Sequence, residues 1–199
     1  MKNKPRFLNK PIVSIFKMIL DEFTGWLNFF FRVLPVTPIS NKLRNYYWHF
    51  CFKGKYNIYH VGRMTNFFNL DKIEIGYQLS IGENCIVDAS DSDAGIYFGN
   101  NVLIASGLFI RVVNHRFDRK DIPIRLQGYK GKTLKYKEKQ YNVVIEDDVW
   151  IASNVTILSG VKIGKGSIIG SGSLLIKEVP PYSIVGAPTA VILASRDII

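Results

Sequence analysis

The chain has 199 residues, a hydrophobic fraction of 47% and a formal net charge of +10. This length allows one or two domains with a buried core, and the hydrophobic fraction excludes a disordered chain. Two cysteines are too few for a disulfide scaffold or a cysteine-rich zinc domain. The net charge alone suggests nucleic acid, an anionic membrane or a phosphate-bearing ligand as partner.

The positive charge is concentrated in two segments. Residues 1–60 hold ten Lys or Arg and two acidic residues, and residues 111–140 hold ten and three, so the segments carry +8 and +7 while the remainder carries −5. A nucleic-acid-binding domain more often has one basic face and a recognisable module. The sequence contains no zinc finger, aromatic RNA-binding signature or basic zipper, so we expect no nucleic-acid partner.

The N-terminal region is predicted to be helical, basic and aromatic. Fourteen of the 26 aromatic residues lie within residues 1–59. Residues 12–34 favour a helix, and residues 40–52 favour a second, shorter one. The longest uncharged run of the first helix, residues 23–31, is far shorter than the roughly 20 residues that a membrane span needs.

Two interpretations of these helices stay open. They pack on their own domain or on a partner subunit, or they lie on an anionic membrane with Trp26 and residues 29–31 as anchors. Lys17 interrupts the apolar stretch and no small-residue cleavage site follows, which argues against a secretory signal peptide. We therefore expect a cytoplasmic protein, with peripheral contact on the inner face of the cell membrane through residues 1–57 as the open alternative.

The rest of the chain has a period of six residues. Large aliphatic residues recur at Ile145, Ile151, Ile157, Ile163, Ile169 and Leu175, and small or β-branched residues recur at Val149, Val155, Val161, Ser167, Ser173 and Val179. A helix would repeat near 3.6 residues and a plain strand near two, whereas a fixed longer period indicates a solenoid. We predict one short strand per hexapeptide, with the aliphatic side chain inside a narrow prism. This domain spans residues 58–192, with an insertion at 116–142 and a tail at 193–199.

Four motifs carry a family resemblance: NVLIASG at 101–107, NHRFDR at 114–119, the repeats at 144–175, and KEVPPYSIVGAP at 177–188. Through them the chain resembles the hexapeptide-repeat acyltransferases, and is most similar to the subgroup that O-acetylates sugars. The resemblance implies a mainly β fold, a left-handed parallel β-helix, preceded here by the helical region and broken by one long inserted loop. It also implies a homotrimer with active sites between subunits, acetyl-CoA as acyl donor and no metal.

His115 is the candidate general base. It closes a complete repeat and directly precedes the insertion, where a solenoid concentrates function. In the resembling family the histidine at this place takes the proton from a sugar hydroxyl, a task that suits imidazole near neutral pH. Asp118 is a candidate to orient the imidazole or contact substrate, but it also fits a turn carboxylate. Asn114 either binds substrate or closes the turn.

Two further residues are candidates for substrate binding. Trp150 precedes the inward Ile151 and so points outward, where a subunit interface or the acceptor pocket would cover it. Asp88 follows an early repeat, and it either binds a sugar hydroxyl or is a solvated corner carboxylate.

The cofactor residues are assigned by resemblance. Main-chain groups of Ala152, Ser153 and Ser171 are expected to line the cofactor groove between coils, with Lys177 near the adenosine end and Lys165 as a helper. An exposed lysine is also commonly just solvated. The family often has Lys or Arg two places after the proline of its closing motif, whereas here Pro188 is followed by Thr189 and Ala190.

These observations predict an acetyl-CoA-dependent O-acetyltransferase. The implied acceptor is a sugar hydroxyl of a bacterial surface polysaccharide or its lipid-linked precursor, attacking directly with His115 as base. An antibiotic-type small-molecule acetyltransferase and a non-catalytic β-helix scaffold are the alternatives. A cysteine nucleophile is disfavoured because Cys85 occupies a buried repeat position, and no metal-ligand spacing occurs.

Overall fold

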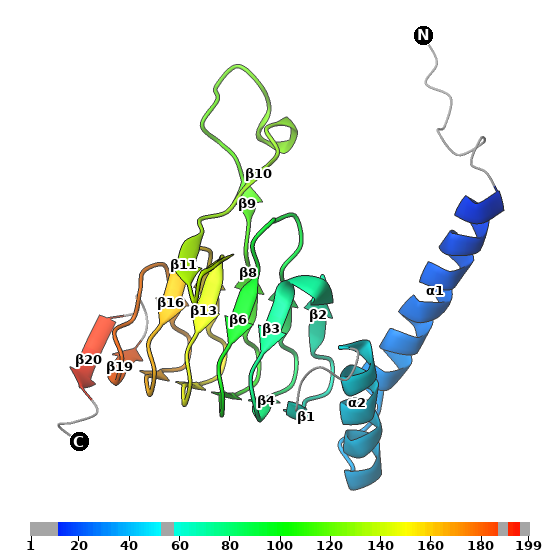
Figure 1. The fold of residues 1–199 in the computed structure, drawn as a ribbon, viewed down its shortest axis with the longest axis horizontal. Coiled ribbons are helices and arrows are strands. Elements are labelled where there is room, and N and C mark those ends of the chain that lie inside the picture. The colour runs from blue at the N-terminus through cyan, green and yellow to red at the C-terminus, as the bar shows by residue number, and fades with distance from the viewer. Residues whose placement is uncertain (1–11, 53–57, 187–190, 196–199) are drawn as a thin grey trace.

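The computed structural model describes residues 12–52, 58–186 and 191–195 as two helices followed by a β-helix (Figure 1). The predicted fold class is confirmed: the chain winds as a left-handed parallel β-helix of three faces. Both predicted helices are present, α1 at Ile12–Val33 and α2 at Pro38–Cys51. None of the described helices is both long and apolar enough to cross a membrane.

Each of the first four coils contributes one strand to each of three faces. The seven-stranded face contains β1 (Ile58–Val61), β4 (Leu79–Ile81), β7 (Leu103–Ile104), β14 (Trp150–Ile151), β17 (Ile168–Ile169), β19 (Ser183–Gly186) and β20 (Val191–Ser195). The five-stranded face contains β2 (Asn66–Phe68), β5 (Ile86–Asp88), β8 (Phe109–Arg111), β15 (Thr156–Leu158) and β18 (Leu174–Leu175). The four-stranded face contains β3 (Ile73–Ile75), which follows the short helix η1 (Leu70–Lys72), and β6 (Ile96–Phe98), β13 (Val143–Ile145) and β16 (Val161–Ile163).

The six-residue period is the step from one face of the β-helix to the next, and equivalent positions stack from coil to coil. The parallel register aligns Ile81, Ile104, Ile151 and Ile169 in one column, and all four are buried. The small and β-branched residues of the second series, Val149 to Val179, are buried as well. Corners leave little room: a Cβ added to Gly82 would lie 2.7 Å from the carbonyl carbon of Ala105 in the next coil. The strand β20 runs antiparallel and extends to Ser195, beyond the predicted end of the domain at residue 192.

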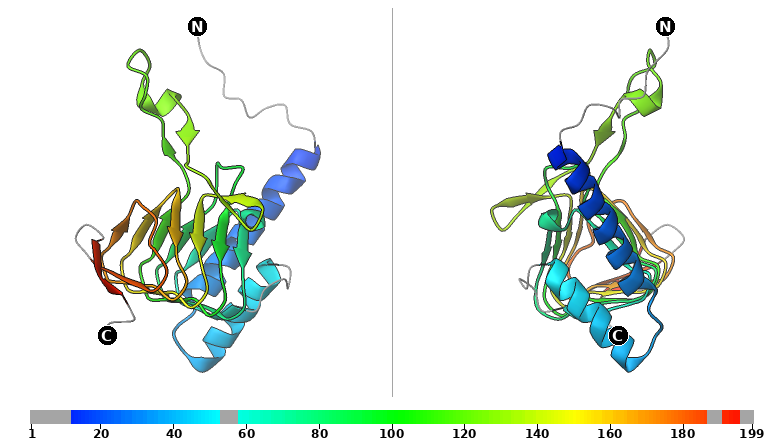
Figure 2. Two further views of the ribbon diagram at one scale, coloured as in Figure 1. Left: turned by 60° about the vertical axis from the view of Figure 1, so that its left-hand side comes forward. Right: turned by 90° about the vertical axis from the view of Figure 1, so that its right-hand side faces the viewer.

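The helix pair lies at the N-terminal end of the β-helix (Figure 2). Thr37 caps α2 by accepting a hydrogen bond from the Ser40 N–H at 3.3 Å, and Pro38 occupies its first turn. Asn45 fixes α2 to β1 twice, donating to the Tyr59 carbonyl and accepting from the Val61 N–H, both at 2.9 Å.

The insertion is more regular than the irregular loop that the sequence predicted. It leaves the β-helix after β8 and begins as a hairpin, β9 (Asn114–His115) and β10 (Tyr129–Lys130), with η2 (Ile124–Leu126) near its tip. This first hairpin projects from the body of the molecule (Figures 1 and 2). A second hairpin, β11 (Leu134–Tyr136) and β12 (Lys139–Tyr141), contacts the four-stranded face, where the Lys137 ammonium donates to the Tyr97 hydroxyl at 2.8 Å.

Asn142 joins the end of the insertion to the β-helix. Its side chain is fully buried, accepts from the Ser92 hydroxyl at 2.7 Å and donates to the Lys132 carbonyl at 2.9 Å. Its backbone N–H donates to Gly95, and its carbonyl accepts from Gly160, both at 2.7 Å. One residue therefore ties together both hairpins and the coil above.

We predict that Asn142→Ala destabilises the protein by about 1–3 kcal/mol, because it removes the part-buried hydrogen bonds to the Ser92 hydroxyl and the Lys132 carbonyl from a fully buried position. Hydrogen exchange over residues 114–141 should rise more than exchange in the coils. Chemical denaturation and hydrogen-exchange mass spectrometry measure the two effects. The exposed neighbour Gln140 provides the control, Gln140→Ala, which should change neither. Equal stability of the two variants would contradict this role of Asn142.

Candidate active site

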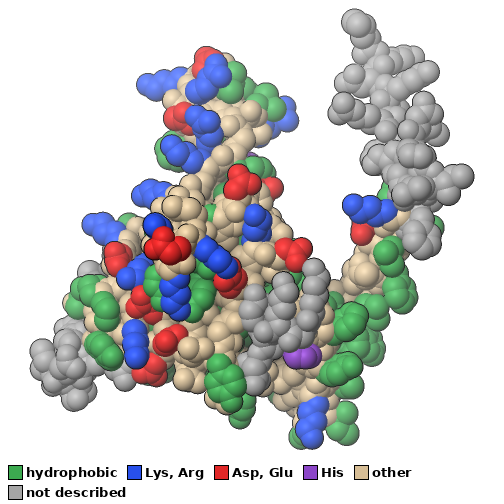
Figure 3. Space-filling view, in the orientation of Figure 1, with side chains coloured by type: hydrophobic (Ala, Val, Ile, Leu, Met, Phe, Trp, Pro, Cys, Tyr) green, Lys and Arg blue, Asp and Glu red, His purple; other side chains and the backbone are tan. Residues whose placement is uncertain are grey.

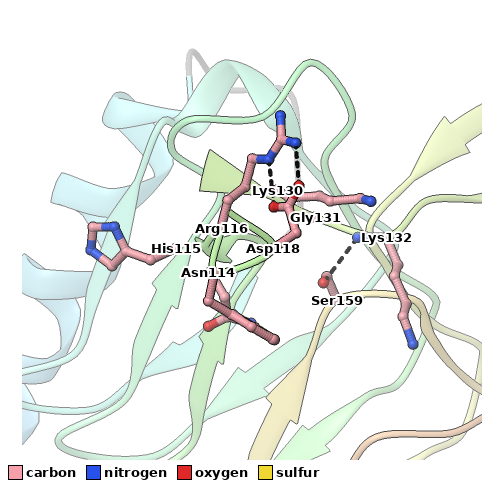
Figure 4. A pocket seen from close by; sticks show the side chains of 9 residues that line it. Asn114, His115, Arg116, Asp118, Lys130, Gly131, Lys132 and Ser159 are labelled. Carbon is pink, nitrogen blue, oxygen red and sulfur yellow. Dashed lines mark hydrogen bonds and ion pairs between the residues drawn. The ribbon is translucent and has the colours of Figure 1, made fainter. Parts of the chain in front are cut away.

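A pocket of about 350 Å³ lies where the first hairpin leaves the β-helix (Figure 4). This pocket corner is the edge at which the five-stranded face turns into the four-stranded face. The pocket is lined by the two ends of the hairpin, the segment that follows it and one residue of the next coil: Asn114, His115, Arg116, Phe117, Asp118, Lys130, Gly131, Lys132 and Ser159. Gly131 is required for this geometry, since a Cβ there would lie 2.2 Å from the Val112 carbonyl oxygen.

His115 lies in β9 opposite Tyr129 of β10, with the two ring centroids 4.6 Å apart. The histidine is exposed, and within the described residues no hydrogen bond holds either imidazole nitrogen. In Figure 4 the imidazole points away from the carboxylate of Asp118. The ring is thus held by its aromatic neighbour, and its nitrogens stay available to an incoming group.

Asp118 does not contact His115, contrary to the expectation that it orients the imidazole. Both of its carboxylate oxygens accept from the Arg116 guanidinium, at 3.0 and 2.7 Å. This pairing lowers the pKa of Asp118 to about 2. The physical reason is proximity along the hairpin strand, where a guanidinium two residues away offers a bidentate partner. Asp118 is therefore a permanent anion that fixes Arg116 at the pocket.

The two lysines of the pocket, Lys130 and Lys132, form no ion pair among the described residues, although Lys130 also helps to lower the pKa of Asp118. Arg116 and Arg119, by contrast, are each paired within the hairpin. The Lys132 N–H donates to the Ser159 hydroxyl at 3.1 Å, which connects the insertion to the coil above. The net charge offered to a ligand here is positive.

Asn114 and Asp88 also lie at the pocket corner. Asn114 pairs with Lys130 in the hairpin register and lines the pocket. Asp88 ends β5 one coil below, where its carboxylate accepts from the Ser90 N–H at 2.9 Å and lies 3.8 Å from Arg111 Nε. Asp88 is not among the residues that line the pocket.

The expected cofactor residues separate into two groups. Ala152 and Ser153 follow β14, and Ser171 follows β17 in the next coil, where the Gly172 N–H donates to the Ser153 carbonyl at 2.9 Å. These three residues therefore lie together, at the edge between the seven-stranded and five-stranded faces. Lys177 lies elsewhere: it falls between β18 and the bridge from Val179 to Ile163, and so at the edge between the five-stranded and four-stranded faces.

Lys165 and Trp150 lie away from the pocket of the same chain. Lys165 occupies the third edge, after β16, where its N–H donates to Glu146 Oε2 at 2.8 Å. Lys165 and Ser153 therefore lie at different edges of a single chain, and the role of Lys165 as a helper stays a prediction. Trp150 points outward from the seven-stranded face as predicted, with 46% of its surface exposed and Leu103 and Ile168 beside it.

Sequence reasoning missed several pocket residues, namely Arg116, Lys130, Lys132 and Ser159. The +7 charge of residues 111–140 is the signal for the three cations. Ser159 gives no such signal, because it is an ordinary corner residue of the repeat. Only the return path of the insertion brings it to the pocket that His115 also lines.

Other chemistry has little support among the described residues. No group of three or more His, Cys, Asp or Glu there is placed to hold a metal ion. Burial raises the pKa of the Cys85 thiol, which opposes its use as a nucleophile. The departure from the family pattern at Pro188, Thr189 and Ala190 lies outside the described residues.

Comparisons with known proteins agree with this architecture. Residues 142–177 match the bacterial transferase hexapeptide (six repeats) family. A hexapeptide-repeat-containing acetyltransferase from Vibrio cholerae is 26% identical, with 89% of this chain and 91% of that chain covered and a TM-score of 0.60. Its complex with acetyl-CoA is 24% identical over 89% and 87% of the chains, also at 0.60.

Two sugar acetyltransferases share the fold at lower identity. A maltose O-acetyltransferase from Clostridium difficile is 20% identical over 89% and 88% of the chains, with a TM-score of 0.57. A galactoside acetyltransferase in complex with coenzyme A is 21% identical over 96% and 94%, with a TM-score of 0.63. No curated protein sequence matches the chain significantly. The chain thus carries the bacterial transferase hexapeptide repeat on the left-handed β-helix fold of the hexapeptide-repeat acetyltransferases.

Proposed function

We propose that the protein is an acetyl-CoA-dependent O-acetyltransferase that acts on a sugar hydroxyl. The observation that carries this proposal is His115, an exposed imidazole without a hydrogen-bond partner among the described residues, at a cationic pocket where the repeat is interrupted. The acetyl-CoA and CoA complexes of the Vibrio and galactoside enzymes support the donor. The maltose and galactoside enzymes support a sugar acceptor.

In the proposed reaction His115 acts as general base. Its free imidazole nitrogen takes the proton of the sugar hydroxyl while that oxygen attacks the thioester carbonyl carbon of acetyl-CoA. The tetrahedral intermediate then collapses with cleavage of the carbon–sulfur bond, and the thiolate of CoA takes the proton back from the imidazolium. The products are the acetyl ester and free CoA, and no acyl-enzyme forms.

The charges around the pocket suit such a donor. Coenzyme A is strongly anionic, and Lys130, Lys132 and Lys177 lie at one corner of the β-helix. Main-chain groups at Ala152, Ser153 and Ser171 lie at a different edge. We propose that these two sets face each other across a homotrimer interface, so that each active site takes His115 from one subunit and the second edge from its neighbour. The outward Trp150 would then contact the acceptor or the neighbouring chain.

The biological setting follows as part of the same proposal. Acetyl-CoA is a cytoplasmic metabolite, so we place the reaction in the cytoplasm. The acceptor class is a sugar of a bacterial surface polysaccharide or its lipid-linked precursor. An acceptor screen by mass spectrometry, with mono- and disaccharides, lipid-linked sugars and aminoglycosides, tests this choice. Acetylation of aminoglycosides alone would replace it with an antibiotic-type activity.

We predict that His115→Ala lowers kcat by about 10²–10⁴-fold, the usual contribution of a general base. Release of the CoA thiol in the presence of the best acceptor measures the rate. Acetyl-CoA binding, followed by calorimetry, should be retained, because the imidazole acts on the acceptor. The matched control is His49→Ala, which changes an exposed histidine of α2 and should keep wild-type activity. Full activity of His115→Ala would refute the proposed base.

Asp118→Asn is predicted to lower kcat/KM by less than about tenfold, since Asp118 pairs with Arg116 and not with the base. Loss of an orienting carboxylate would instead cost up to about 10⁴-fold. The pKa of Asp118 is lowered to about 2, so its ion pair is present at neutral pH and is lost only as pH falls through that value. The shape of the pH–rate profile between about pH 5 and 8 should therefore not change. A loss of about 10³-fold or more would restore the orienting role.

Subunit complementation tests the shared site. We predict that His115→Ala and Trp150→Ala trimers are each impaired, and that trimers reassembled from a one-to-one mixture regain about a quarter of wild-type activity. An interface is active only if one subunit keeps His115 and its neighbour keeps Trp150. With subunits drawn at random, this occurs at about a quarter of the interfaces. If the mixture is no more active than either variant alone, the two residues act within one chain or Trp150 is not part of the site.

A further inference from the structure

The helix α1 carries an apolar stripe that the β-helix does not cover. Its side chains recur at helical spacing and are all exposed: Ile19, Phe23, Trp26, Phe30 and Val33. Phe23 and Trp26 expose 60% and 65% of their surfaces. On the opposite side, Asn28, Phe31 and Arg32 are partly buried against the rest of the protein. Met18, Leu20, Leu27 and Phe29, on other sides of the helix, are exposed as well, so among residues 17–33 only Asn28, Phe31 and Arg32 are not exposed.

The helix α2 also leaves apolar side chains exposed on one side, although Trp48, Tyr47 and Cys51 pack inward against the core. Its exposed side chains form a second stripe, Ile39, Leu43, Tyr46 and Phe50, whereas the buried positions at a spacing of four are Ser40, Arg44 and Trp48. We call these two exposed stripes together the apolar surface of the helix pair. Hydrophobic side chains gather along both helices at this end of the molecule (Figure 3).

Polar contacts fix which side of α1 faces outward. The buried Arg44 guanidinium donates to the Phe31 carbonyl at 3.3 Å and to the Leu34 carbonyl at 2.5 Å, so a cation holds the C-terminal end of α1. The Met64 N–H of the first coil donates to the Arg32 carbonyl at 2.9 Å. On the same side Phe31 stacks on Tyr47, with ring centroids 4.6 Å apart. The orientation of the stripe is therefore built into the fold.

An apolar surface of this size needs a cover, because each exposed apolar Å² costs about 25 cal/mol. The charge of residues 1–60 indicates which kind of partner would cover this apolar surface. Of the ten cations in residues 1–60, four lie in the described helices (Lys17, Arg32, Lys42 and Arg44), against Asp21 and Glu22, and four more directly precede α1 in the sequence. An anionic lipid surface would pair with this net positive charge, whereas a second copy of the chain would bring like charges together. Trp and Tyr side chains also favour the membrane–water boundary.

We propose that α1 and α2 form a docking surface for anionic membranes, with the helix pair lying in the headgroup region and the β-helix on the aqueous side. Neither described helix can span the bilayer, so the contact is peripheral. The proposal depends on the helices alone and holds whatever reaction the pocket catalyses. Of the two interpretations that the sequence left open, the proposal favours the membrane-lying helix pair.

Vesicle flotation of the full-length wild-type protein tests this docking. We expect binding to phosphatidylcholine vesicles containing about 30% phosphatidylglycerol, at least about tenfold weaker binding to pure phosphatidylcholine, and release by about 0.5 M salt. Phe23→Ser with Trp26→Ser should weaken binding to the anionic vesicles at least about tenfold. The matched control, Ile124→Ser with Leu126→Ser, changes two exposed apolar residues of the insertion and should bind like the wild type.

Three outcomes would overturn the proposal. The first is absence of wild-type binding to anionic vesicles, and the second is equal binding to neutral ones. The third is a change of oligomeric state in the helix variant: if sedimentation without lipid shows a smaller assembly than the wild type and the control, the apolar surface is a subunit interface. Replacing Lys2, Lys4, Arg6 and Lys10 by Gln keeps the apolar surface and should reduce only the salt-sensitive part of binding.

Discussion

The stacking of one aliphatic side chain per strand inside a narrow triangular prism is the constraint on which the structure depends. Each coil buries its interior against the coils on either side, so the register between coils must be kept at every turn. The column of Ile81, Ile104, Ile151 and Ile169 records this requirement. Because the strands themselves cannot change length without losing register, extra chain can leave only at a corner.

The position of the pocket follows from that restriction. The insertion leaves after β8 and returns before β13, so both of its ends are forced to one corner. Closure there requires a buried connector, Asn142, and a residue without a side chain, Gly131. The same closure brings Lys130 and Lys132 beside His115. Interrupting the repeat therefore creates a concave cationic site on a scaffold whose outer faces are otherwise flat.

The sequence was most informative where structure is periodic. Ile145 to Leu175 set the core, the face directions and the outward position of Trp150, because each follows from position within a hexapeptide. The insertion has no period, so its hairpins were missed. Asp118 was assigned to His115 by proximity in sequence, yet Arg116 is equally close and is a bidentate donor. Ser159 and Lys177 reach the pocket corner only through stacking between coils, which a single strand cannot reveal.

The helix pair shows a different limit of sequence reasoning. A period of 3.6 residues identifies an apolar side of α1 but not what that side touches. The deciding contacts are long-range and polar: Arg44 holds the end of α1, and Met64 of the first coil donates to Arg32. Both contacts involve the side of α1 opposite Phe23, Trp26 and Phe30, so these three side chains remain exposed. Burial of the Arg44 guanidinium, which holds α1 with its apolar side outward, costs desolvation free energy. A lipid surface that covers the apolar side of α1 would offset this cost.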